Sequence, residues 1–160
     1  MAEVDDSAVD TRDFPELFQR VVGRIDIGSI VPRRTAPAGR SWAASAPLPF
    51  AATMTARAGA RLYGVLATGG APLLSAEATR IRRRDADFVV GVPVLKSYGY
   101  SHGDEVTGGR EEAFGFGGLG GSEAYADPTC GFSFAFTHSR LTVVDSAPEV
   151  AATVRKELGI

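Results

Sequence analysis

The chain has 160 residues, of which 44% are hydrophobic and 22% charged, so it is the size of one domain that can bury a core. Its formal net charge of −2 gives no reason to expect nucleic acid or an anionic membrane as a partner. The first six residues are polar and acidic and lack the basic start and apolar stretch of a secretory signal, so a soluble, cytoplasmic chain is expected. Cys130 is the single cysteine, which excludes an internal disulfide, and neither a metal nor another cofactor is expected.

The first third of the chain has a composition unlike the rest. Asp13-Phe14-Pro15-Glu16 forms a capping box and predicts a short helix over residues 14–22. Prolines and small polar residues in residues 23–49 disfavour both helix and central strand. We therefore divide the chain into a segment 1–54, with a helix and an irregular stretch, and an α/β region 55–160. Such a long irregular stretch is unusual in a compact domain and indicates an incomplete one.

Three further helices are expected. Thr55 can cap a helix that ends at Gly69-Gly70, with an apolar face formed by Ala58, Leu62, Val65 and Leu66. A shorter helix opens at Ser75 and carries four arginines near its end, namely Arg80, Arg82, Arg83 and Arg84. Residues 146–149 form a second capping box, for a terminal helix that presents Val150, Val154 and Leu158 on one face and stops at Gly159.

Between these helices the pattern predicts strands. They are expected over residues 88–94, 95–100, 122–126, 132–137 and 141–144, with a polar turn over 103–110. The predicted fold class is α+β, an antiparallel sheet of about five strands flanked by helices.

Two short motifs match known catalytic or binding patterns by their letters. Gly99-Tyr100-Ser101-His102-Gly103 matches the nucleophile elbow G-x-S-x-G, and Asp127 and His138 follow in the order of an α/β-hydrolase triad. The elbow requires a helix immediately after the serine, and residues 104–109 are a poor helix start. Residues 115–120 match the dinucleotide motif G-x-G-x-x-G, but a strand is predicted where a helix N-terminus is needed. Ser101, Asp127 and His138 remain an alternative catalytic set.

The order of several segments resembles a known family. These segments are the helix at residues 55–70, Pro72-Leu73-Leu74-Ser75, the glycine-rich run 115–122, Ala126-Asp127-Pro128 and residues 131–136. Together they resemble the C-terminal part of the β-lactamase-related serine hydrolases, which include class C β-lactamases, β-lactamase-type esterases and penicillin-binding proteins. The resemblance implies a sheet flanked by helices, with an acyl-transfer site between this unit and a helical domain.

The resemblance also implies roles for residues of the glycine-rich run. Phe116-Gly117-Gly118 corresponds to the family's third motif, on a strand that borders the pocket, and the N–H of Leu119 to an oxyanion donor. Gly117, Gly118 and Gly120 would let a substrate lie against the strand. Phe116 departs from the pattern, because relatives place lysine or histidine there and a phenyl ring cannot supply charge or a hydrogen bond.

The family's nucleophile motif S-x-x-K does not occur in this sequence. Its only lysines are Lys96 and Lys156, and Pro93 and Thr153 stand three residues before them. We therefore expect a C-terminal fragment of a serine hydrolase, without catalytic residues of its own and inactive alone. Its expected partners are a complementary N-terminal chain or a second copy, with an ester or β-lactam bound after complementation. The alternatives are a non-catalytic interaction module that retains the fold, and a small serine hydrolase that uses Ser101.

Overall fold

The computed structural model describes residues 54–87, 92–118, 121–138 and 146–160. Their elements in chain order are α3 (Ala56–Ala67), a 3-10 helix (Ala76–Thr79), β1 (Arg83–Ala86), β2 (Pro93–Lys96), β3 (Ser101–His102), β4 (Phe114–Gly117), β5 (Glu123–Asp127), β6 (Phe132–Phe136) and α4 (Ala147–Leu158). The predictions for residues 14–22, 23–49 and 141–144 lie outside the described residues.

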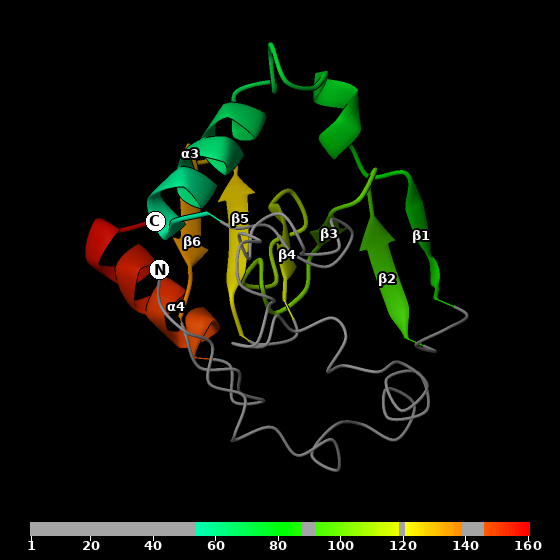
Figure 1. Cartoon of the computed structure of the whole chain (residues 1–160). Helices are drawn as coiled ribbons and strands as arrows, with labels where there is room; N and C mark the ends of the chain where they lie inside the picture. The colour runs from blue at the N-terminus through cyan, green and yellow to red at the C-terminus, as the bar shows by residue number, and fades with distance from the viewer. Residues whose placement is uncertain (1–53, 88–91, 119–120, 139–145) are drawn as a thin grey trace, which may run out of the picture.

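The six strands form one antiparallel sheet in the order β1-β2-β3-β4-β5-β6, so each strand pairs with the next along the chain (Figure 1). An antiparallel sheet with helices was predicted, and the sheet has one strand more than the expected five. Phe114 pairs with Ala126 across β4 and β5, and Tyr125 pairs with Phe134 across β5 and β6. Successive side chains on a strand point to opposite faces, so Ala126 and Tyr125 mark the two faces of the sheet.

Helix α3 covers the face that carries Ala126. As predicted, the Thr55 hydroxyl caps the helix by accepting a hydrogen bond from the Ala58 N–H at 3.2 Å. Tyr63 and Leu66 then pack in a core cluster with Phe114 and Ala126. Burial, followed by the nearby Tyr100 hydroxyl, raises the pKa of Tyr63 to about 12.

The predicted apolar face of α3 was wrong in its position. Of the predicted residues Leu66 is buried, together with Gly59 and Tyr63, whereas Leu62 and Val65 are each 36% exposed. Tyr63 occupies the inner position because its ring packs against the rings of Phe114 and Tyr100, at centroid distances of 6.2 and 5.9 Å. A second apolar stripe is thus left on the outside of α3.

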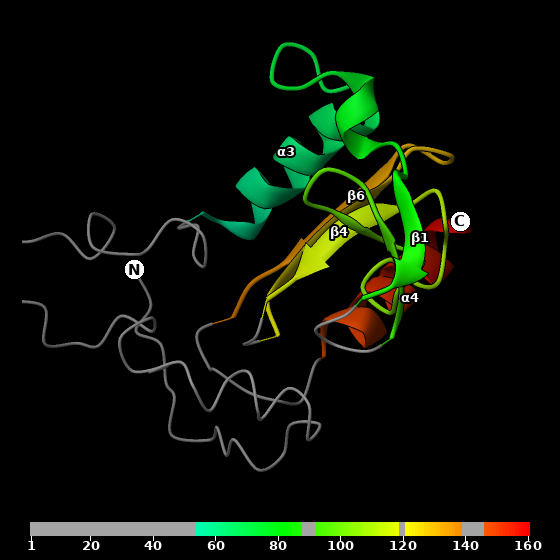
Figure 2. The same ribbon diagram turned by 90° about the vertical axis from the view of Figure 1, so that its right-hand side faces the viewer.

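Helix α4 packs on the opposite face of the sheet from α3 (Figure 2). Its Ala151 joins a core cluster with Tyr125 and Phe132, and Gly159 ends the helix in the left-handed conformation, as predicted. The predicted face was right only for Val154, which packs against this cluster. Ala147, Ala151 and Arg155 are buried, while Val150 and Leu158 are exposed. The Ser146 side chain makes no capping hydrogen bond.

The segment between α3 and β3 differs most from expectation. The predicted arginine-bearing helix is a single 3-10 turn, and Arg83 and Arg84 instead lie on β1, paired with Lys96 and Leu95 of β2. The strands predicted over residues 88–94 and 95–100 are not separate in the described residues, because β2 spans the boundary between them. Residues 97–100 then turn back into β3. Neither helix touches this end of the sheet in Figure 1, so β1 and β2 extend beyond the helical layers.

Among the described residues, no helix has the length and apolar character needed to cross a membrane.

Candidate functional site

The glycine-rich motif lies at the end of β4. Phe116 and Gly117 are its last two residues, and the Phe116 ring is 55% exposed. The N–H of Gly118 donates to the carbonyl oxygen of Ser122 at 2.7 Å, so it closes the turn into β5. Leu119 and Gly120, the candidate oxyanion donor and its neighbour, lie outside the described residues, and their roles stay predictions.

Two glycines of this motif have structural reasons to be glycine. A Cβ on Gly115 would lie 2.4 Å from the Cβ of Tyr125, and one on Gly117 would lie 2.9 Å from Cγ2 of Val106. Both distances are shorter than van der Waals contact. The close approach that glycine permits is therefore used by β5 at Gly115 and by the 103–110 turn at Gly117.

Ser101, the serine of the elbow-like motif, lies on β3 and is only 8% exposed. It pairs with Lys96 of β2 on one side and with Gly115 of β4 on the other. The Lys96 ammonium donates a hydrogen bond to Ser101 Oγ and also lies 5.5 Å from the centre of the Phe116 ring. A nucleophilic serine needs a base that accepts the proton of its hydroxyl. The Ser101 oxygen instead accepts a hydrogen bond from a cation. Residues 104–109 form a bend and turns, so no helix follows Ser101, as predicted.

His102 follows Ser101 and is held in a structural role. Its Nδ1 lies 3.1 Å from the Glu111 carbonyl oxygen, so Nδ1 carries the proton and donates a hydrogen bond to that oxygen. Its Nε2 lies 3.0 Å from Ser97 Oγ. Burial lowers the pKa of His102, with Lys96 acting in the same direction, so the ring is neutral near pH 7 and Nε2 accepts from the Ser97 hydroxyl. His102 thereby ties the 97–100 turn to the segment before β4.

The structure places the acid and the histidine of the alternative set Ser101, Asp127 and His138 at opposite ends of β6. Asp127 pairs with Phe132 at the beginning of β6, whereas His138 lies beyond Phe136 at the end of that strand. The length of β6 alone is about 13 Å at 3.3 Å per residue. His138 contacts the Phe136 ring instead, at a centroid distance of 5.6 Å.

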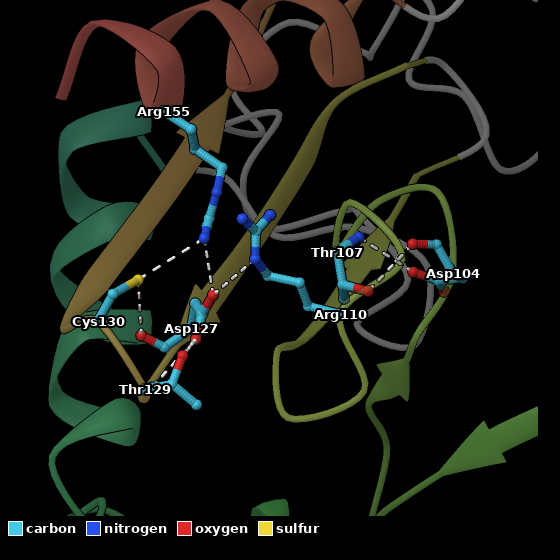
Figure 3. Close-up of polar contacts among 7 residues, drawn as sticks. All are labelled: Asp104, Thr107, Arg110, Asp127, Thr129, Cys130 and Arg155. Carbon is cyan, nitrogen blue, oxygen red and sulfur yellow. Dashed lines mark hydrogen bonds and ion pairs between the residues drawn. The ribbon is translucent and has the colours of Figure 1, made fainter. Parts of the chain in front are cut away.

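The buried Asp127 is the centre of a polar cluster (Figure 3). Its Oδ2 lies 2.8 Å from Nη2 of Arg155 on α4 and 3.5 Å from Nε of Arg110, while its Oδ1 accepts hydrogen bonds from the N–H and hydroxyl of Thr129. Burial alone would raise the pKa of Asp127, but the hydrogen bonds from Thr129 and Arg155 outweigh it and lower the pKa. Cys130 Sγ lies 3.6 Å from Arg155. This cluster fastens α4 to the β5–β6 turn.

An open groove of about 620 Å³ lies beside β1, β2 and β3, and the motif analysis did not identify it. Its apolar wall comes from residues 92–95, and Lys96, Ser101 and His102 are polar side chains along it. The sequence feature that could have indicated this groove is Lys96, which follows an apolar segment in a chain with only two lysines. Within the described ranges, no three histidine, cysteine, aspartate or glutamate side chains are grouped as metal ligands.

No protein-family model matches the chain. The esterase/β-lactamase LipL of Mycobacterium tuberculosis (strain ATCC 25618 / H37Rv) is 43% identical over 96 residues, which are 54% of this chain and 22% of LipL. A penicillin-binding protein homologue from Caulobacter crescentus has a similar structure, with a TM-score of 0.54 and 33% identity over 68% of this chain and 32% of that protein. In sequence and fold, the chain is therefore similar to part of the β-lactamase-related serine hydrolases.

A second solved structure is also similar in fold to part of this chain. A family VIII carboxylesterase gives a TM-score of 0.53 and 28% identity, over 63% of this chain and 31% of the carboxylesterase. The chain therefore spans between about a fifth and a third of the length of these β-lactamase-related serine hydrolases.

Proposed function

We propose that this chain is the C-terminal portion of an esterase-like member of the β-lactamase-related serine hydrolases and that it does not hydrolyse esters alone. The supporting observation is the 43% identity to an esterase/β-lactamase over 22% of that protein's length. Strand β4 ends with Phe116 and Gly117, and the family resemblance implies that this strand borders the pocket.

The chemistry of the family explains the expected inactivity. Acyl transfer requires a nucleophile and a base, and removing them leaves only the small rate enhancement from binding and oxyanion stabilisation. The chain has no S-x-x-K, and Ser101 is hydrogen-bonded by a cation. A complementary chain that supplies the serine and lysine would complete the pocket.

The outer surface of α3 supports a partner for this portion. Leu62 and Val65 are exposed on α3, and Leu73 and Leu74, which follow it, are 55% and 42% exposed. Large exposed apolar patches mark interaction sites in soluble proteins, and these side chains are candidates for such a patch. The same stripe also suits the alternative function, a non-catalytic interaction module. A monomer or homodimer that unfolds cooperatively without any complementary chain would favour that module over a fragment.

The test is hydrolysis of a chromogenic ester and of a chromogenic cephalosporin by the isolated chain. We expect neither substrate to be turned over above the rate of a heat-denatured sample. A Ser101→Ala variant serves as the matched control, and its rates should equal those of the parent. Turnover that is lost in Ser101→Ala would overturn the proposal and establish the small serine hydrolase in its place.

A further inference from the structure

The groove beside β1, β2 and β3 has the size and lining of a small-molecule site. Its volume of about 620 Å³ lies within the range of about 300–1,000 Å³ that is usual for ligand pockets. Val92, Pro93, Val94 and Leu95 form an apolar wall along β2. Such walls hold a hydrocarbon chain, while a small number of polar groups fixes the orientation of the ligand.

Most charged side chains along the groove already have partners. Arg84 forms an ion pair with Glu111, and Asp85 forms one with Arg83 at 3.3 Å. The Asp104 carboxylate accepts a hydrogen bond from the Thr107 N–H at 3.2 Å, which closes the turn after β3 (Figure 3). These groups are therefore engaged in holding the walls of the groove.

Lys96 differs from the other charges of the groove. In the parts of the chain that the structure describes, no carboxylate lies within ion-pair distance of its ammonium group. Its contacts are Ser101 Oγ and the face of the Phe116 ring. Lys96 is half-buried, and a partly desolvated cation without an anion is unfavourable. An ammonium has three donors, so Ser101 leaves others for a ligand.

We propose that this groove binds a carboxylate that carries an apolar chain. The Lys96 ammonium pairs with the carboxylate, and Val92, Val94 and Leu95 contact the chain. Ser101 and Phe116 act as positioning residues, because the hydroxyl and the ring face hold the ammonium at the polar end of the groove. The site shares Phe116 with the pocket edge of the proposed hydrolase, but it uses no nucleophile and none of the residues after Gly117.

Titration of the uniformly ¹⁵N-labelled chain with hexanoate tests the site, and hexanamide is the uncharged control of the same shape. We expect hexanoate to shift the amide signals of residues 94–96 and 101–104 in a saturable manner. Hexanamide should bind about tenfold more weakly or worse, because it lacks the charge-assisted hydrogen bond. Equal affinities, shifts confined to α4, or no saturable shift with hexanoate would each overturn the proposal.

The two lysines of the chain offer a matched pair of variants. Lys96→Met removes the charge and keeps the length of the side chain, and it should weaken hexanoate binding about tenfold or more. Lys156→Met removes an exposed lysine on α4 and should bind as the parent does. Lys96→Arg keeps the charge and should retain most of the affinity, which separates loss of the site from loss of folding. Parent-like binding by Lys96→Met, or loss of binding in Lys96→Arg with the amide spectrum intact, would contradict the role of the charge.

Discussion

The carboxylate of Asp127 and the guanidinium of Arg155 form a buried ion pair, with Oδ2 and Nη2 2.8 Å apart. Asp127 ends β5 and Arg155 lies in the last turns of α4, so the pair joins elements that are distant in the sequence. The side chains are 1% and 7% exposed. Breaking a buried pair leaves an uncompensated charge, which costs more than the pair itself contributes.

Arg155→Met should therefore lower the free energy of unfolding by about 3 kcal/mol or more. Lys156→Met, at the exposed neighbouring position, should change it by no more than about 0.5 kcal/mol. Urea denaturation of both variants measures the difference. If Arg155→Met is as stable as Lys156→Met, the pair does not fasten α4 to the sheet.

The neutral His102 gives stability a pH dependence with a defined sign. Its pKa in the folded chain lies below the ordinary value of 6.5, so at lower pH the unfolded chain binds more protons than the folded one. Stability should fall as the pH drops below about 6.5 and level off below the folded pKa. The contribution of Asp127 is lost only at lower pH, as the pH falls through its own lowered pKa.

A His102→Gln variant should lack this histidine component. Urea denaturation from about pH 8 to about pH 5, on both sides of the ordinary histidine pKa, compares its pH dependence with that of the parent. The parent should lose more stability across this range than the variant. Identical pH dependence in the two proteins would show that His102 is not held neutral.

The two glycines of β4 should differ in their tolerance of alanine. At Gly115 the new Cβ would meet the backbone of β5, including the Ala124 carbonyl oxygen at 2.5 Å, and neither strand can move without breaking the pairing. Gly115→Ala should cost about 1–3 kcal/mol, as overpacked cores do. Gly117→Ala should cost less, because the Val106 side chain can change its rotamer. The reverse order of stabilities in thermal unfolding would contradict the strand register at β4.

Phe116 can be replaced by the histidine that relatives carry. Because the ring is 55% exposed, Phe116→His should change the free energy of unfolding by no more than about 0.5 kcal/mol. The variant should still fail to hydrolyse a chromogenic ester, because restoring the third motif does not supply a nucleophile. Ester turnover by Phe116→His would place the defect at Phe116 rather than at the missing S-x-x-K.

Sequence patterns located the elements with strong local signals. Thr55 and Gly159 mark the ends of α3 and α4 because a capping hydroxyl and a left-handed glycine are local features. The patterns missed β1, since Arg83 and Arg84 on an exposed strand show no apolar alternation. The two-residue strand β3 is equally invisible, because its pairing depends on β2 and β4.

The buried faces and the sites depend on tertiary contacts that a linear pattern does not contain. Arg155 is buried only because Asp127 lies opposite it, and this contact turns α4 away from its predicted face. Asp127 and His138 follow Ser101 in the order of a catalytic set, but the direction of β6 carries them apart. Lys96 was considered only for S-x-x-K, and its contact with Phe116 crosses from β2 to β4.

We propose above all that this chain carries the pocket-edge strand of a serine hydrolase without the nucleophilic serine. Reaction of the isolated, folded chain with a fluorophosphonate, followed by intact-mass spectrometry, tests it most directly, because this reagent modifies activated serines. We predict that the mass stays unchanged while a complete esterase of the family is fully modified in parallel. A stoichiometric adduct that peptide mapping assigns to a serine of this chain would contradict the claim.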